Sequence, residues 1–143
     1  MKKLFLLLTV LLILACSGID KRSDTPTYMA DEIVVSYNRE ARFTTFITKE
    51  GDAVTGNVIQ KLDNGGKNTW EVENGLAVRQ VMYYPNGQIE RILEMKNGTE
   101  HGNFLMFYSD GGKYVEQHYE NGKPVGTWYR WNRDGEIVET IEH

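Results

Sequence analysis

Few side chains in this 143-residue chain are of the types that carry out catalysis or bind metals. His101 and His118 are not at the close spacing of metal ligands, and no cysteine follows Cys16, so the pattern matches no zinc site. Gly51–Gly56 has the four-residue gap of a phosphate-binding loop, but Asn57 follows where a lysine is required. No grouping of serine, histidine and aspartate stands out. We therefore expect no catalytic residue, no metal, no cofactor and no enzymatic activity.

The one cysteine, Cys16, stands at the end of a secretory signal. Two lysines precede an apolar run of about twelve residues, which is too short to span a bilayer. The run ends in Ile13-Leu14-Ala15-Cys16, which resembles the bacterial lipobox, in which a small residue precedes a cysteine that becomes lipidated. We expect residues 1–15 to be a lipoprotein signal peptide. The alternative is an ordinary cleaved signal with an incidental cysteine.

An acylated Cys16 anchors a chain without spanning the membrane. Ser17 is not the aspartate that resembles an inner-membrane retention signal, so the outer membrane or cell surface is the favoured location within the cell envelope. Residues 16–30 are polar and aperiodic, and we expect the lipidated cysteine and a flexible linker there. Without its signal the chain has 14 basic and 20 acidic residues, a net charge of −6. Nucleic acid and anionic headgroups are therefore poor partners, and the lipid anchor is the expected membrane contact.

Residues 31–143 are organised by turns that recur at a nearly constant interval. Asparagine or aspartate followed by glycine tolerates positive φ at both positions, as a two-residue type I′ hairpin turn requires. The steps between these dipeptides are 10, 12, 11, 13, 11 and 13 residues, so two strands and two turns form a repeat of about 24 residues. The predicted turns are Asn64-Gly65, Asn74-Gly75, Asn86-Gly87, Asn97-Gly98, Asp110-Gly111, Asn121-Gly122 and Asp134-Gly135.

The segments between the turns are rich in β-branched and aromatic residues, as strands are. The sequence therefore predicts an all-β domain, an elongated antiparallel meander of stacked hairpins in a single-layer twisted sheet. We expect about four and a half units and roughly nine strands, with Asp31 to Gly51 as a degenerate first unit. The strand from Glu136 to Glu142 has acidic residues spaced through it, as a protected sheet edge should.

Two segments carry a resemblance to a known family. They read NGTEHGNFLMFYSDGGK, beginning at Asn97, and NGKPVGTWYRWNRDGE, beginning at Asn121. Both look like the MORN-type repeat in its bacterial variant, the form found in the YwqK antitoxin-like family. The match is strong over residues 74–143 and weak over 31–73, where Val58 and Lys61 replace the aromatic residues. The resemblance implies an interaction or scaffold module without catalysis.

The aromatic residues of the repeat are the candidate binding residues. Tyr83, Phe107 and Trp131 occupy one column, and strands in register place them on one face. Two interpretations stay open: aromatic hot spots for a partner, or rings that pack on one another and stabilise the sheet. Phe104, Met106, Tyr108 and Trp128 form a second candidate patch with the same two interpretations.

The predicted function is therefore a lipid-anchored, extracytoplasmic protein-binding or scaffold module built from MORN-like repeats. A protein partner is expected, and self-association through a sheet face or edge is a further option. The alternative is an antitoxin or immunity-type protein that binds and occludes a toxin. Because the chain is exported, that alternative requires a secreted toxin or a partner in the envelope.

Overall fold

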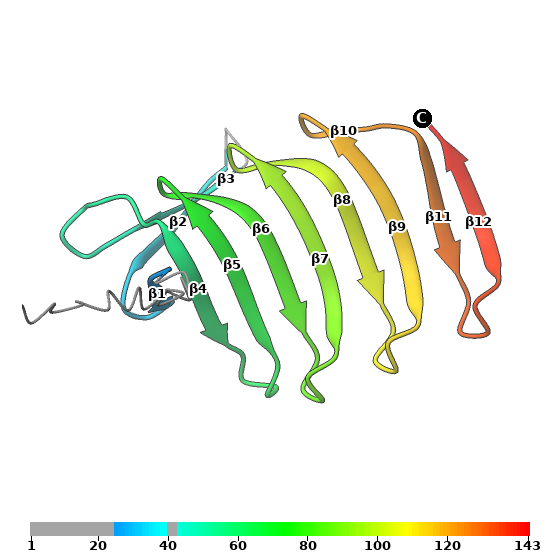
Figure 1. Cartoon of the computed structure of the whole chain (residues 1–143), viewed down its shortest axis with the longest axis horizontal. Coiled ribbons are helices and arrows are strands. Elements are labelled where there is room, and N and C mark those ends of the chain that lie inside the picture. The colour runs from blue at the N-terminus through cyan, green and yellow to red at the C-terminus, as the bar shows by residue number, and fades with distance from the viewer. Residues whose placement is uncertain (1–24, 40–42) are drawn as a thin grey trace, which may run out of the picture.

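The computed structural model describes residues 25–39 and 43–143, which contain strands and no helix. None of these residues forms a helix long and apolar enough to cross a membrane. All strands belong to one sheet (Figure 1). The strands are β1 (Thr27–Met29), β2 (Val34–Asn38), β3 (Phe43–Ile47), β4 (Gly56–Lys61), β5 (Lys67–Glu73), β6 (Leu76–Tyr83), β7 (Ile89–Lys96), β8 (Thr99–Phe107), β9 (Lys113–Glu120), β10 (Lys123–Pro124), β11 (Thr127–Trp131) and β12 (Ile137–Glu142).

From β4 onward the chain is an antiparallel meander, and each long strand lies beside the next (Figure 1). The order β4-β5-β6-β7-β8-β9-β11-β12 follows the sequence, and the two-residue β10 pairs with the end of β9. The predicted all-β meander of hairpins is therefore confirmed. The described residues contain twelve strands, against the roughly nine expected. β1 lies in the segment expected as a flexible linker, residues 31–51 contribute both β2 and β3, and β10 is a two-residue strand.

All seven predicted dipeptides lie in turns, but the turns are of two kinds. Asn74, Asn97 and Asn121 have φ of 49°, 51° and 51°, and glycine with positive φ follows each of them, so these three are the predicted type I′ turns. The other four have positive φ only at the glycine. Two-residue turns therefore join the strands at one end of the sheet, and longer turns join them at the other.

The turn between β6 and β7 illustrates the longer kind. The Gly87 N–H donates to the Tyr84 carbonyl at 2.9 Å, and the Tyr84 N–H donates to the Gln88 carbonyl at 2.9 Å. The Asn86 side chain accepts from the Gln88 N–H at 3.1 Å. This is a three-residue hairpin loop closed by a glycine bulge. A type I′ turn is thus the wrong prediction here, because the asparagine stabilises the loop through its side chain and does not need a positive φ.

A bulge recurs in each later unit. The register shifts at Met82/Tyr83, Met106/Phe107 and Arg130/Trp131, which follow one another at the interval of the repeat. The β4–β5 ladder has no such shift. The steps of 10 and 12 residues between the turns from Asn64 to Asn86 are together two residues shorter than the later pairs of 11 and 13. The bulge residue that β4 and β5 lack accounts for one of these two residues.

The segment from 31 to 51 differs from the prediction, because it does not add an earlier unit to the ladder. The edge neighbour of β4 is β1, in parallel register, and the β2–β3 hairpin joins the sheet at Thr45 and Leu76 of β6. This segment has Glu40 where the repeat has its turn glycine. Folding the hairpin over the sheet buries Phe46 completely.

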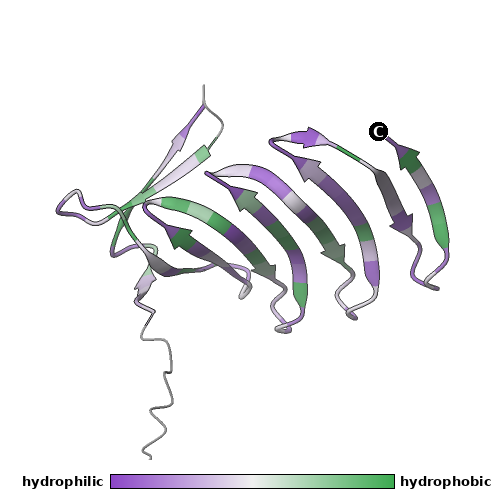
Figure 2. Cartoon of the chain, turned by 45° about the horizontal axis from the view of Figure 1, so that its top comes forward, coloured by the Kyte–Doolittle hydropathy of each residue, from purple (hydrophilic) through white to green (hydrophobic). Residues whose placement is uncertain are grey.

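The hairpin creates a small core at one end of an otherwise single-layered sheet. Phe46 packs against Trp70, with ring centroids 5.6 Å apart. The face of the sheet that β2–β3 covers is called the hairpin face, and the opposite one the open face. In Figure 2 hydrophobic and hydrophilic bands alternate along the long strands, as expected of a sheet with two distinct faces. The buried core residues are Ile33, Phe46, Val54, Val58, Val72 and Ala77.

Candidate binding surfaces

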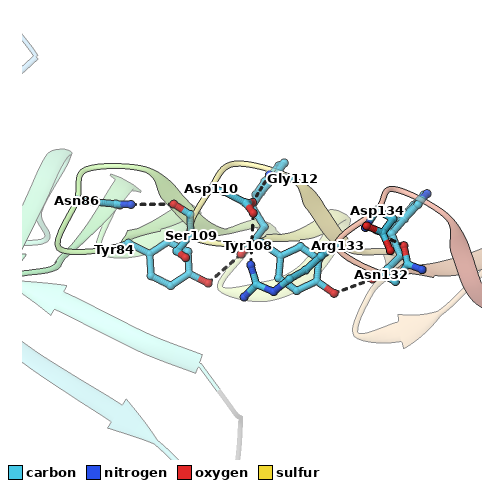
Figure 3. Close-up of polar contacts among 11 residues, drawn as sticks. Tyr84, Asn86, Tyr108, Ser109, Asp110, Gly112, Asn132, Arg133 and Asp134 are labelled. Carbon is cyan, nitrogen blue, oxygen red and sulfur yellow. Dashed lines mark hydrogen bonds and ion pairs between the residues drawn. The ribbon is translucent and has the colours of Figure 1, made fainter.

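Side-chain contacts between successive long turns form a ladder along one end of the sheet (Figure 3). The Tyr84 hydroxyl donates to the Phe107 carbonyl at 2.9 Å, and the Tyr108 hydroxyl donates to the Trp131 carbonyl at 2.8 Å. Both contacts span 23 residues. Each tyrosine therefore joins one repeat unit to the next, which is the neighbour contact on which a repeat array depends.

Further polar groups extend this turn ladder. The Asn86 amide donates to the Ser109 carbonyl at 2.7 Å. Arg133 lies 3.3 Å from Asp110 and 4.5 Å from the centre of the Tyr108 ring. Tyr108, predicted as a binding residue, thus has its ring and its hydroxyl occupied within the chain. Tyr84 was not singled out from the sequence, although its place in the column Leu62, Tyr84, Tyr108 and Asn132 was a usable signal.

The predicted column Tyr83, Phe107 and Trp131 lies on the open face, but its members do not touch. Ile89 and Lys113 of the intervening strands separate them in register. Lysines approach two of the rings: Lys67 Nζ lies 4.2 Å from the centre of Tyr83, and Lys113 Nζ lies 4.9 Å from the centre of Trp131. These are cation–π contacts. The column is therefore stabilised by lysines from neighbouring strands rather than by stacking of its own rings.

A cluster of charged and polar side chains lies beside this column. Lys113 donates to Glu116 at 2.7 Å, and His118 Nε2 lies 3.4 Å from the other Glu116 oxygen. The hydrogen bond from Lys113 is the main cause that lowers the pKa of Glu116. On the open face, half-buried aromatic rings thus lie beside charged side chains that are already paired within the chain.

Phe104 and Trp128 lie on the hairpin face, opposite to Phe107 and Trp131. Phe104 pairs with Leu93 and with Gln117. The Trp128 indole donates to the His118 carbonyl at 3.1 Å, and its ring lies 5.2 Å from Tyr119. Burial raises the pKa of Tyr119. Trp128 therefore has a structural role, whereas Phe104 offers a partly buried apolar ring on this face.

A groove of about 600 Å³ lies between the β2–β3 hairpin and the hairpin face. This volume falls within the range of ligand pockets. Trp70 and Leu93 contribute apolar surface to it, and Glu100 and Lys123 contribute opposite charges. The groove is lined by Tyr37, Phe43, Thr44, Trp70, Ala77, Gln80, Leu93, Met95, Gly98, Thr99, Glu100, Asn121, Gly122 and Lys123.

This groove was not predicted from the sequence. One of its walls is the β2–β3 hairpin, and we expected that segment to form the first repeat unit of the sheet. Its residues include two aromatic side chains of the hairpin, Tyr37 and Phe43, and two tips of type I′ turns. Phe43 sits directly on Gly98, where a Cβ atom would meet the Phe43 Cβ at 2.9 Å. The turn and the hairpin are thus in close contact at this point.

The two histidines considered for chemistry each contact another group of the chain. The His101 Nδ1 accepts from the Asn121 N–H at 3.3 Å, and His118 contacts Glu116. Within residues 25–39 and 43–143 no three histidine, cysteine or acidic side chains are arranged to hold a metal ion. Cys16, the predicted lipidation site, lies outside the described residues.

Comparison with known proteins supports the repeat. No curated protein and no solved structure matches the chain. A family model described as a MORN repeat variant matches residues 79–97. These residues run from β6 through the long turn into β7 and up to the type I′ turn at Asn97. The chain therefore carries a MORN-type repeat, within a sheet of hairpins that recurs at the same interval.

Proposed function

We propose that this chain is a non-catalytic protein-binding or scaffold module, anchored to the bacterial cell envelope through lipid on Cys16. MORN repeats suggest a repeat-based binding or scaffold module. The observation that carries the proposal is the groove on the hairpin face, which combines apolar surface with both charges. Mixed surfaces of this kind are typical of sites that bind proteins or small ligands.

Support for a partner at the hairpin face comes from the contrast between the two faces. On the open face, lysines cover Tyr83 and Trp131. On the hairpin face, Leu93 borders the groove and pairs with Phe104 on the next strand. Apolar surface thus continues from the groove onto β8. A partner that enters the groove and extends over Phe104 buries this surface, and burial of apolar area drives protein association.

The lipid anchor is supported by the sequence. Cys16 follows Ala15 at the end of a short apolar run, and Thr25, where the described residues begin, lies nine positions later. A segment of that length spans at most about 30 Å when fully extended. We propose that the groove works close to the membrane surface, on a partner that is itself in the envelope or arrives there.

The test is affinity capture from the envelope fraction with matched variants of one strand. Phe104→Ala and Phe107→Ala remove similar rings from β8, on opposite faces. Capture of one partner that is lost with Phe104→Ala and kept with Phe107→Ala supports the proposed face. The opposite pattern places binding on the open face and contradicts the proposal. Both variants are first compared with the parent chain for folding by circular dichroism.

The identity of the captured protein separates the module from the antitoxin alternative. A scaffold partner is an envelope or surface protein whose activity is unchanged by binding. An immunity partner is a secreted toxin whose activity the chain inhibits in a purified assay. Inhibition that is lost with Phe104→Ala favours the antitoxin alternative, on the same face of the sheet.

A further inference from the structure

Among residues 25–39 and 43–143, one edge of β12 has no strand beside it. Within the described residues its only neighbour is β11. It also carries Ile137, Val138 and Ile141, which are exposed by 55%, 51% and 42%. The other exposed large hydrophobic side chains of the described residues, Val34, Val35 and Tyr37, lie on β2, which pairs with β3 alone. Exposed apolar side chains thus coincide with unpaired strand edges.

The acidic residues of β12 do not protect this edge in the way that the sequence suggested. Glu139 forms an ion pair with Arg130 at 2.7 Å, and Glu142 accepts from the Thr127 hydroxyl at 2.9 Å. Both carboxylates are therefore held by β11, along the face of the sheet. The outward edge of β12 is left with its backbone groups and its apolar side chains, a template for another strand.

The repeat indicates what covers a strand in this position. One and two units earlier, β9 and β7 correspond to β12, and the bulges at the start of all three strands lie at equivalent places. On its far side β7 pairs with β8, and β9 pairs with β11, both in antiparallel register. A strand added to β12 in the same register continues this pattern.

The same correspondence predicts the side chains of the added strand. Val115 of β9 lies opposite Arg130 of β11, and Glu139 takes the place of Val115 in β12. Leu93 of β7 lies opposite an aromatic residue of β8, and Ile141 takes the place of Leu93. The place opposite Glu139 is held by Met106 in β8 and by Arg130 in β11. Because Glu139 is acidic, we expect an added strand to follow β11, with an aromatic residue opposite Ile141 and, two positions later, a basic residue opposite Glu139. A carboxylate has lone pairs for a second cation besides Arg130.

We propose that β12 is a strand-addition site for a partner protein, which contributes an antiparallel extended segment of the form aromatic, any residue, basic. The partner's backbone supplies the hydrogen bonds of the ladder, and its aromatic and basic side chains supply the selectivity. The site is separate from the groove on the hairpin face and does not depend on the function proposed there.

The hydrogen bonds between β11 and β12 show which backbone groups of β12 face outward and are needed by an added strand. The His143 N–H donates to the Gly126 carbonyl at 3.0 Å, toward β11. Backbone groups alternate in direction along a strand, so the N–H groups of Ile141 and Glu139 also face β11, and that of Thr140 faces outward. Thr140→Pro removes an outward donor without removing a bond between β11 and β12, because proline is tolerated where the N–H faces solvent.

The test uses a peptide that copies residues 126–132, Gly-Thr-Trp-Tyr-Arg-Trp-Asn, as the probe. Its binding to the purified full chain is measured by calorimetry. Binding is expected to weaken about tenfold with Thr140→Pro, which removes one backbone hydrogen bond, and to be unchanged with Thr140→Ala. A peptide with Arg130→Glu is expected to bind at least about tenfold more weakly, because it places a carboxylate opposite Glu139.

Equal binding to the Thr140→Pro and Thr140→Ala chains overturns the proposal, as does equal binding of the two peptides. Self-association of the chain that Thr140→Pro abolishes makes a second copy the occupant and also overturns it. If Thr140→Pro does not fold, amide exchange of the unchanged chain decides. Protection of the Thr140 amide upon peptide addition supports strand addition, and unchanged exchange there contradicts it.

Discussion

At the scale of single residues, the tyrosines at the start of the long turns connect one repeat unit to the next, whereas the rings of the aromatic column beside them do not touch one another. Tyr84 and Tyr108 each donate to a carbonyl of the following unit. The pKa of Tyr84 is raised by burial and by the nearby Glu90 carboxylate, as expected of a hydroxyl partly removed from water. Two interpretations of the aromatic column were open from the sequence, a binding surface or rings that stabilise the sheet, and the lysine contacts of Tyr83 and Trp131 favour the second.

We predict that Tyr108→Phe lowers the free energy of unfolding by about 0.5–1.5 kcal/mol, the usual net value of a hydrogen bond to a partly buried group. Equilibrium unfolding in urea measures the change. Tyr83→Phe is the matched control, because the Tyr83 hydroxyl makes no hydrogen bond within the described residues and its ring stays beneath Lys67. Equal losses from the two variants contradict the role of the turn ladder.

Glu116 is expected to make stability depend on pH. Its pKa is held below the ordinary value of 4.5, first by the hydrogen bond from Lys113. A carboxylate with a lowered pKa in the folded state stabilises the fold above the unfolded pKa, and this contribution is lost as the pH falls through the folded pKa. Urea unfolding from neutral to acidic pH should therefore show a loss below pH 4.5. The loss should be smaller for Glu116→Gln and for Lys113→Met, and identical curves for all three chains contradict this assignment.

At the scale of elements, the two kinds of turn are not equivalent, because type I′ turns contact the described part of the β2–β3 hairpin. Gly98 and Gly87 both have positive φ, of 75° and 85°. A Cβ atom at Gly98 would lie 2.9 Å from the Phe43 Cβ, whereas nothing lies within 4 Å of one at Gly87. The hairpin is therefore packed against a turn that is distant in sequence, which couples the start of the fold to the middle of the array.

We predict that Gly98→Ala destabilises the chain more than Gly87→Ala does. Both variants place a side chain in the left-handed region, at a cost of about 1–2 kcal/mol. Gly98→Ala adds a clash with Phe43, which is worth about 1–3 kcal/mol when a packed site is overfilled. Thermal and urea unfolding measure the difference. A smaller additional loss with Gly98→Ala in a chain that also carries Phe43→Gly, which removes the Phe43 Cβ, would show that the contact is the cause. Equal effects of the two glycine variants contradict the observed position of the hairpin.

At the scale of the whole molecule, the sheet is open along its length and has a second layer only where the hairpin covers it. Each unit contacts its neighbours, so local changes act on adjacent units rather than on a common core. The groove and the edge of β12 lie at different parts of this sheet. The two proposed sites therefore leave room for one partner in the groove and another on the edge.

We predict that Cys16→Ser releases the chain from the membrane fraction, because serine lacks the thiol that the lipid would modify. Metabolic labelling with a fatty-acid analogue, followed by fractionation, measures the outcome. The parent chain should be labelled and sediment with membranes, and the variant should be unlabelled. A parent chain that is unlabelled and soluble would favour the ordinary cleaved signal.

The turns and strands of the array could be predicted because they depend on neighbouring residues. Asn97-Gly98 makes a type I′ turn through its own backbone preferences, and the aromatic and β-branched runs on either side favour strands. Because the same turn and strand pattern recurs at a nearly constant interval, successive strands are joined by tight turns, and an antiparallel meander results. The sequence also predicted in part which side chains lie on opposite faces of the sheet. Phe104 and Phe107 are an odd number of positions apart along one strand, and side chains alternate between the faces.

What the sequence by itself determined is therefore the succession of strands and turns, which local backbone conformation decides. Only the tertiary structure decided that Phe46 brings the β2–β3 hairpin across the sheet, that a groove opens beside Leu93, and that the lysines cover Tyr83 and Trp131. Each of these depends on contacts between residues distant in sequence. The free energy of such contacts comes from the apolar surface that two elements bury together, and no local pattern records which two elements will meet.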